Sequence, residues 1–270
     1  MKNIIKNLNE LDIEILKLLY LARYASNKQI ARLFFSDSPT ETTSLRRTNR
    51  TTKKLTDLKL IRHLERRIGG SRAGSGSYVF TLANTGVKLL KQVDDTINDS
   101  RRNAYEPSSN HLKHTLAITE VYTQLKELDR EFENMELEKV EFEPQCWRSY
   151  PQNGGVAQYL KPDLFVHLIL DEYEDLYMVE LDCNTESLTR ILNKSKQFVA
   201  YYNSGIEQNI HGIFPLVIWL VQDEKRKLAI KNKLTTELDN YWQLFEVLTL
   251  DEFSDFVYRN ESEADDKQNI

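Results

Sequence analysis

Three carboxylates lie inside apolar runs, where a buried strand ordinarily carries none. The stretch KPDLFVHLILDEYEDLYMVELD (residues 161–182) places Asp163 at the head of one run and Glu180 and Asp182 at the end of the next. Burying a lone carboxylate is costly unless it is paired with a cation or holds a metal ion. The pattern therefore leaves three interpretations open: a metal site, the remnant of one, or an ordinary hairpin with solvated acids.

The segments around these acids predict an α/β module. Their periodicity predicts helices over residues 111–132, 187–202 and 224–238 and strands over residues 135–147, 161–170, 175–182, 214–222 and 244–250. The resulting order is αβββαβ with a further helix and strand. A fully apolar strand placed between helices, such as FPLVIWLVQ, is typical of a mixed sheet covered on both faces. Glu180 and Asp182 lie two apart on a strand and should share one of those faces.

Charge divides the chain into two unlike parts. Residues 1–103 carry 20 Lys and Arg against 10 Asp and Glu, and the remainder carries 16 against 31. Such asymmetry is a sign that one part meets an anionic polymer. We therefore predict a basic domain over residues 1–103, an acidic α/β domain over 104–260 and a disordered acidic tail over 261–270.

Composition excludes several classes of protein. No apolar run approaches the ~20 residues that span a bilayer, and the first residues lack a signal-peptide core, so we expect a cytoplasmic protein. Two cysteines, Cys146 and Cys183, are too few for a disulfide framework or a four-thiolate zinc site, and we expect both to be buried or reduced thiols. Trp147, Trp219 and Trp242 lie on or beside apolar elements and are expected in the core.

The basic part predicts three helices followed by a β-hairpin. LDIEILKLLYLARY has helical apolar spacing, and Ser26 with Gln29 forms a capping-box pattern that opens a second helix through Phe35. A third helix is expected over Thr42–Lys59. LIRHLERRI and SYVFTLANTG, separated by a glycine- and serine-rich segment, then predict the hairpin. This order is that of a winged helix-turn-helix domain.

The third helix and the hairpin carry a local excess of positive charge. Residues 44–72 contain 10 basic and two acidic residues. We expect part of the third helix to enter the major groove and the hairpin to contact phosphates or the minor groove. The expected DNA contacts are Arg46, Arg47, Asn49, Arg50, Lys53 and Lys54 on the helix and Arg66, Arg67 and Arg72 at the hairpin. The alternative is a solvated basic helix in a protein-binding winged helix.

The αβββαβ order, with Pro-Asp at the head of one strand and a carboxylate at the end of the next, resembles the PD-(D/E)xK nuclease superfamily. The resemblance implies that Asp163 and Glu180 bind Mg²⁺ or Mn²⁺ and that a Lys assists the attacking water. The superfamily places this Lys two residues after the second acid, where this chain has Asp182. Lys194 on the following helix is the expected substitute. The candidate catalytic set is Asp163, Glu180, Asp182 and Lys194.

A structural role for the same residues is the alternative. In it, Glu180 pairs with Lys194, Asp182 caps the next helix or its loop, and Asp163 accepts backbone amides. Because the in-strand Lys is missing, we favour a structural site over an active enzyme.

The whole chain also resembles the replication-relaxation proteins of plasmids, phages and integrative elements. The matching segments are KHTLAITEVYTQL, KPDLFV and ELDCNTESLTRILNKSKQFVAYY. The family pattern's Arg-Gly after the acidic pair is Cys183-Asn184 here. The resemblance implies a protein that binds double-stranded DNA in the replication, relaxation or transfer of a mobile element, or in its regulation, together with replication or transfer proteins.

Three functional hypotheses follow. The first is a DNA-binding protein without catalysis, which forms a homodimer if its site is a palindrome. The second is a metal-dependent endonuclease or nickase directed by the winged helix. The third is a transcriptional regulator or a pure interaction module.

Overall fold

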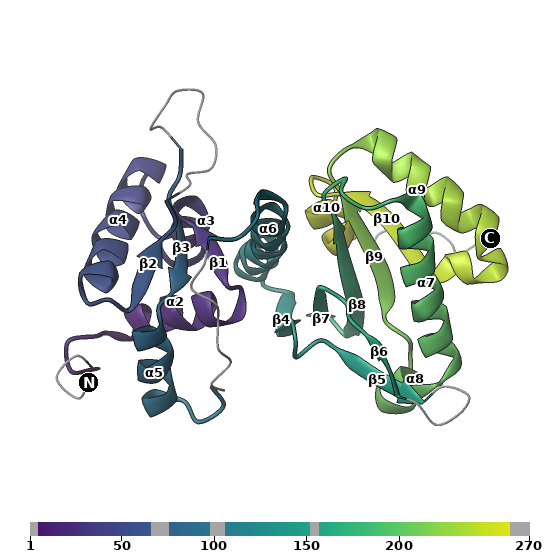
Figure 1. Cartoon of the computed structure of the whole chain (residues 1–270), viewed down its shortest axis with the longest axis horizontal. Helices are drawn as coiled ribbons and strands as arrows, with labels where there is room; N and C mark the ends of the chain where they lie inside the picture. Colours follow the sequence, from purple (N-terminus) through teal and green to yellow (C-terminus); the bar gives the residue numbers. More distant parts are fainter. Residues whose placement is uncertain (1–4, 66–75, 98–105, 152–156, 260–270) are drawn as a thin grey trace. The chain divides into compact units, whose positions relative to one another are not determined.

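The computed structural model describes residues 5–65, 76–97, 106–151 and 157–259 (Figure 1). The chain divides into two compact units, Met1–Thr123 and Gln124–Ile270. This boundary falls inside the helix α6 (Ser109–Glu131), whereas the sequence places it before that helix. The fold is α+β, with several helices and a mixed sheet. Within the described residues, every helix is too short or too polar to cross a bilayer.

The first unit combines helices with a three-stranded antiparallel sheet in the order β1-β3-β2. Its elements before α6 are α2 (Glu10–Leu21), β1 (Tyr24–Ser26), α3 (Asn27–Phe34), α4 (Glu41–Asp57), β2 (Ile61–His63), β3 (Val79–Leu82) and α5 (Asn84–Val93). The three helices and the hairpin strands lie where the sequence predicts them. The short strand β1 was not predicted, because three residues are too few to show an alternating pattern.

Local capping explains where the first helices begin. Ser26 Oγ accepts the Gln29 backbone N–H at 3.2 Å, and Gln29 Oε1 accepts the Ser26 N–H at 3.0 Å. This reciprocal pair is the predicted capping box, and it fixes the start of α3. Thr40 Oγ1 accepts the Thr43 N–H at 3.2 Å and caps the start of α4.

The second unit contains a five-stranded mixed sheet in the order β10-β9-β8-β7-β4. β4, β7 and β8 are antiparallel, while β8, β9 and β10 are parallel. The strands are β4 (Met135–Phe142), β5 (Arg148–Pro151), β6 (Ala157–Leu160), β7 (Leu164–Leu170), β8 (Tyr173–Asp182), β9 (Leu216–Val221) and β10 (Phe245–Thr249). The helices are α7 (Leu188–Asn203), α8 (Ile206–His211), α9 (Glu224–Glu237), the 3-10 turn η1 (Asp239–Leu244) and α10 (Phe253–Arg259).

Both faces of this sheet are covered, as the apolar strands predict. α7 and α9 lie on one face, over a core that includes Phe165, Met178 and Trp219 (Figure 1). α10 lies on the other face, where Phe256 contacts Tyr177 edge to face. The hairpin β5–β6 and the short elements α8, η1 and α10 were not predicted, because each is too short to show a sustained apolar period in the sequence.

The predicted burial is confirmed for three of the five Cys and Trp side chains. Cys146 and Cys183 are buried, and Trp219 lies in the core as expected. Trp147 is half-buried. The expectation for Trp242 was wrong: 38% of this residue is exposed, because it lies on the irregular turn η1 rather than on the adjacent strand.

Candidate functional site

The helix α4 presents one polar and positively charged face to solvent. Arg46, Asn49, Arg50 and Lys53 are exposed, and their spacing places them on one side of the helix. The opposite side is buried through Leu55 and the residues Ser44, Thr48 and Thr52. The buried threonine hydroxyls each donate to the carbonyl four residues earlier at 2.9 Å, so the helix buries polar side chains without leaving a donor unsatisfied.

Two of the predicted contacts on α4 are engaged within the protein. Arg47 is half-buried, pairs with Asp37 at 2.6 Å and lies over the Phe35 ring at 5.0 Å. Lys54 Nζ pairs with the buried Asp12 carboxylate at 2.5 Å. Both side chains therefore help to hold α4 in place.

The four exposed residues of α4 make fewer and weaker contacts within the protein. Lys53 pairs with Asp57 one turn away at 2.7 Å, and both side chains are mostly exposed, so this pair is weak. Asn49 Oδ1 accepts from Asn27 Nδ2 at 2.7 Å. Arg46 and Arg50 have no ion pair within the part of the chain that the structure describes. Arg66, Arg67 and Arg72 lie outside the described residues.

Lys54 is expected to contribute to the stability of the first unit, whereas its neighbour Lys53 is not. Replacing Lys54 with methionine leaves the buried Asp12 carboxylate without its cation. We expect a loss of about 1–2 kcal/mol in the free energy of unfolding, below the value for a fully buried pair because Lys54 is 40% exposed. Urea unfolding followed by far-UV circular dichroism measures it. Lys53→Met is the matched control, and equal losses in both variants would contradict the assignment.

The three acids in the second unit share one face of the sheet. Phe165 pairs with Met178 in the antiparallel ladder between β7 and β8, and this register places Asp163 opposite Glu180. Met178 and Phe165 pack into the core under α7 and α9. Strand alternation therefore puts Asp163, Glu180 and Asp182 on that same side. All three are buried.

Lys194 from α7 supplies a cation to the first two acids. Its ammonium is ion-paired and hydrogen-bonded to Glu180 Oε2. Burial by itself lowers the pKa of Lys194, but the charges of Glu180, Asp163 and Glu186 outweigh burial and raise that pKa above its ordinary value. Lys194 is therefore a charged ammonium at neutral pH and is unsuited to act as a base.

Arg226, at the start of α9, supplies a second cation that the sequence did not point to. Its Nε donates to Asp182 Oδ2 at 2.5 Å, and its Nη2 donates to the Glu186 carbonyl at 2.5 Å. Asp182 does not cap the next helix, because Ser187 caps α7 by accepting the Arg190 N–H at 3.3 Å. No signal in the sequence identifies Arg226, since it lies 44 positions from Asp182 in a helix with several basic residues.

Internal pairing takes up part of the carboxylate cluster that the nuclease resemblance assigns to a divalent metal. Mg²⁺ needs free carboxylate oxygens and keeps several waters. Here Asp163 Oδ2 accepts the Leu181 N–H at 2.8 Å, and one oxygen each of Glu180 and Asp182 is paired with Lys194 and Arg226. The second oxygens, Glu180 Oε1 and Asp182 Oδ1, are buried and accept no hydrogen bond from the described residues. Among the described residues, no group of three or more His, Cys, Asp and Glu side chains is arranged to hold a metal ion.

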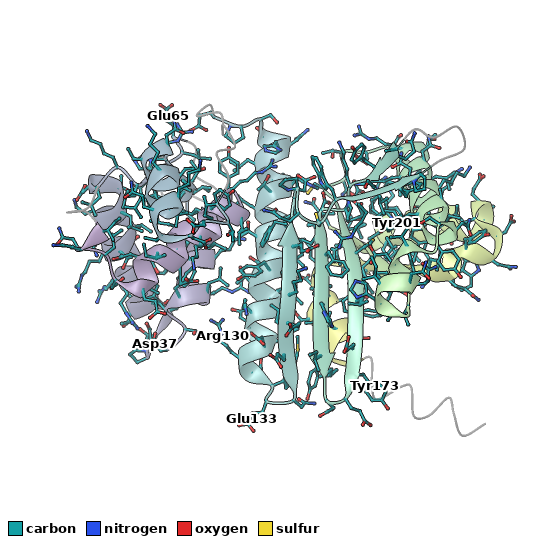
Figure 2. All side chains as sticks on the ribbon, turned by 90° about the horizontal axis from the view of Figure 1, so that it is seen from below. Asp37, Glu65, Arg130, Glu133, Tyr173 and Tyr201 are labelled. Carbon is teal, nitrogen blue, oxygen red and sulfur yellow. The ribbon has the colours of Figure 1, made fainter. Side chains whose placement is uncertain are left out.

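Two further polar side chains have partners within the protein. Glu120, on α6 within the first unit, pairs with Arg32 and accepts from Gln29 Nε2 at 3.0 Å. Tyr201, labelled in Figure 2, is buried and donates to Glu207 Oε1 at 2.7 Å. Burial and this bond raise the pKa of Tyr201, so its hydroxyl stays protonated at neutral pH.

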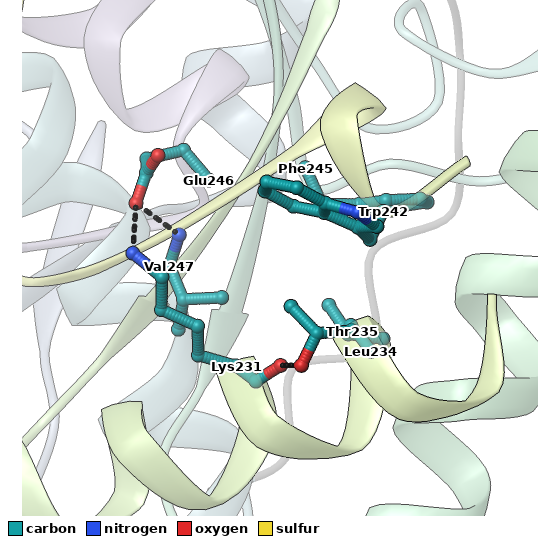
Figure 3. Close-up of a pocket in the computed structure, with 7 residues that line it drawn as sticks. All are labelled: Lys231, Leu234, Thr235, Trp242, Phe245, Glu246 and Val247. Atoms are coloured by element: carbon teal, nitrogen blue, oxygen red, sulfur yellow. Dashed lines mark hydrogen bonds and ion pairs between the residues drawn. The ribbon is translucent and has the colours of Figure 1, made fainter. Parts of the chain in front are cut away.

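A shallow pocket of about 250 Å³, including the open space above it, lies between α9 and β10 (Figure 3). Its wall is formed by Trp242 and Phe245, and Lys231 and Glu246 face each other at 3.5 Å on its rim. None of the three buried acids lines it.

Two carboxylates accept backbone N–H groups of the strand β10. Glu246 Oε1 accepts the Val247 N–H at 3.2 Å, and Glu252 Oε2 accepts the Thr249 N–H at 2.8 Å. These carboxylates occupy outward N–H groups of the edge strand β10 and protect it from pairing with another strand.

The molecule is thus a two-unit α+β protein with an exposed cationic helix in one unit and an internally paired acidic cluster in the other. The family model described as replication-relaxation matches residues 16–217. This match covers most of the chain, and the protein belongs to the replication-relaxation family. Searches of curated proteins and of solved structures found no match.

Proposed function

We propose that this protein binds double-stranded DNA through α4, in the replication or relaxation of a plasmid or other mobile element. In this proposal the first unit is a winged helix-turn-helix domain. The order α2-β1-α3-α4-β2-β3 supports it, because α3 and α4 then form the helix-turn-helix and β2 and β3 the wing. The observation that carries the proposal is the exposed face of Arg46, Asn49, Arg50 and Lys53.

The electrostatics of that face favour a nucleic-acid partner. Its three cations lie on a single helix face, and only Lys53 has an acidic neighbour within one turn. Each phosphate that such a cation neutralises contributes about −0.9 to the slope of log K against log salt concentration. Asn49 and the arginines also have the donors that read base edges in the major groove. A homodimer is the expected assembly for a palindromic site.

The second unit then serves for assembly or for contact with replication proteins. We infer that it is a nuclease-like fold without hydrolytic function, and the antiparallel strands β7 and β8 with Asp163 opposite Glu180 support the fold comparison. The paired state of its acids supports the absence of catalysis. The functional division at residues 103/104 remains part of this proposal.

Reversing the charge of Arg50 tests DNA binding. We expect Arg50→Glu in the full chain to weaken binding to a labelled duplex about tenfold to a hundredfold at about 50 mM NaCl, because one contact is lost and a repulsive charge is added. Fluorescence anisotropy over a salt series measures both the affinity and its salt slope.

The matched control is Lys88→Glu, which makes the same change in charge at an exposed position on α5. It should bind duplex DNA nearly as well as the unmodified protein. If both variants weakened binding equally, the effect would come from net charge and not from α4. An Arg50→Glu variant with unchanged affinity for duplex DNA would contradict the proposal.

A further inference from the structure

The hairpin β5–β6 has one inward and one outward face. Ser149 pairs directly with Tyr159, and Arg148 with Leu160. Tyr150 and Leu160 are buried, while Ser149 and Tyr159 are exposed. Trp147 and Lys161 directly flank the paired strands, next to the Arg148–Leu160 pair. Trp147 is partly buried against the core, and Lys161 is exposed.

Aromatic and cationic groups gather on this outward face. Lys161 Nζ lies 4.4 Å from the centre of the Trp147 ring. Tyr159 is 60% exposed, and the residue opposite it is a serine, whose small side chain leaves the tyrosine ring uncovered. The Trp147 indole N–H donates to Glu143 Oε1 at 3.4 Å, which holds the indole in place. The result is an open tyrosine ring beside a tryptophan and a lysine.

The charge of this segment differs from that of the surrounding unit. Residues 144–161 contain no Asp or Glu and two basic residues, whereas residues 104–270 as a whole carry 31 acidic side chains against 16 basic ones. Arg148 is engaged on the inward side with Glu141 and Glu207 at 2.9 Å each. Lys161 is therefore the cation that the outward face offers to an anionic ligand.

A second tyrosine in the same unit provides a contrast. Tyr173 is 59% exposed, nearly as much as Tyr159, and is the first residue of β8, after the turn from β7 (Figure 2). It stands in the sequence DEYED, between four carboxylates. Repulsion disfavours a phosphate chain there, so exposure alone does not make a nucleic-acid contact. Tyr159 combines exposure with a strand pair, β5–β6, that itself carries no Asp or Glu.

We propose that the outward face of β5–β6, formed by Trp147, Tyr159 and Lys161, is a stacking surface for unpaired bases of single-stranded DNA. Tyr159 stacks on a base, and Lys161 contacts the adjoining phosphate. This surface adds a contact for a locally opened strand to the duplex contact made by α4. The inference rests on the proposed function only in assigning DNA as the physiological ligand.

The test uses the full chain carrying Arg50→Glu, so that binding through α4 is already weakened. A labelled oligothymidine is titrated, and affinity is measured by fluorescence anisotropy. Tyr159→Ala should weaken binding about tenfold, while Tyr159→Phe, which keeps the ring, should restore it. Tyr173→Ala removes an equally exposed tyrosine and should leave the affinity unchanged. Lys161→Ala should weaken binding and lower the salt slope by about 0.7.

Several results would overturn this proposal. They are the absence of oligothymidine binding before Tyr159 is changed, equal effects of Tyr159→Ala and Tyr173→Ala, or a Tyr159→Phe variant as weak as the alanine variant. Duplex binding by the chain with Arg50 intact should be unaffected by Tyr159→Ala. Failure of the α4 proposal would appear separately, as duplex binding that is insensitive to Arg50→Glu.

Discussion

Lys194→Met is expected to lower the free energy of unfolding of the second unit by about 3–5 kcal/mol, because it leaves the buried Glu180 carboxylate without its cation. Glu180 is 1% exposed and Lys194 is mostly buried, so solvent screens this pair little. All three tryptophans, Trp147, Trp219 and Trp242, belong to the second unit. Urea unfolding followed by intrinsic tryptophan fluorescence therefore reports on this unit alone.

A double-mutant cycle separates the lost pair from the lost side chain. Glu180→Gln combined with Lys194→Met should recover much of the stability, because a neutral pair replaces an uncompensated buried charge. Lys196→Met, at an exposed position on the same helix, is the control and should cost little. A small loss in Lys194→Met, or an additive double variant, would show that the pair is not coupled.

The stability that the Lys194–Glu180 pair contributes depends on pH with a defined sign. The pKa of Lys194 is raised in the folded protein, so the pair's stabilisation is fully present below the ordinary lysine pKa of 10.5. It disappears only as pH rises through the higher folded value. The difference between the unmodified protein and Lys194→Met should therefore stay constant from about pH 7 to pH 9.

The same cluster predicts how the protein responds to metal. Because Lys194 and Arg226 already neutralise two of the three acids, Mn²⁺ should not raise the unfolding midpoint of the unmodified chain. Calorimetric binding of Mn²⁺ that disappears in Glu180→Gln would contradict an internally paired cluster. It would also revive the endonuclease hypothesis.

Gly86→Ala is expected to destabilise the first unit by about 2–3 kcal/mol, although alanine is ordinarily favoured over glycine within a helix by about 1 kcal/mol. A Cβ atom at position 86 would lie 2.3 Å from the Leu60 carbonyl oxygen and 2.6 Å from the Leu82 side chain. The Leu60 oxygen also accepts the Ala83 N–H at 2.9 Å, so it is not free to move away. Steric overlap therefore reverses the usual helix preference.

Far-UV circular dichroism in urea measures this change, with tryptophan fluorescence as an internal reference for the second unit. Lys88→Ala, at an exposed position of the same helix α5, should be neutral or slightly stabilising. If Gly86→Ala were as stable as the unmodified protein, α5 would not approach Leu60 as closely as the structure has it.

Local patterns in the sequence predicted much of this fold. The capping box at Ser26 and Gln29, the apolar strand 216–221 and the burial of Cys146 follow from short-range spacing and composition. The exposed face of α4 follows from its helical period, and its role in binding DNA remains a prediction. β1 and the hairpin β5–β6 were missed because such short strands are stabilised by their partners in the fold.

For the acidic cluster, the sequence predicted only some of the ion pairs. The two-residue period of a strand places Glu180 and Asp182 on one face, and the pairing of Glu180 with Lys194 was one of the predicted alternatives. The pairing of Asp182 with Arg226 was not predicted, and the pairing of Lys54 with Asp12 was not predicted either.

The amino-acid sequence by itself determined the helices and main strands, the division of charge and membership of the replication-relaxation family. Only the tertiary structure decided which cations neutralise the buried acids. The physical reason is range: periodicity and capping act within a few residues, whereas the partner of a buried charge depends on which distant helix packs over its strand.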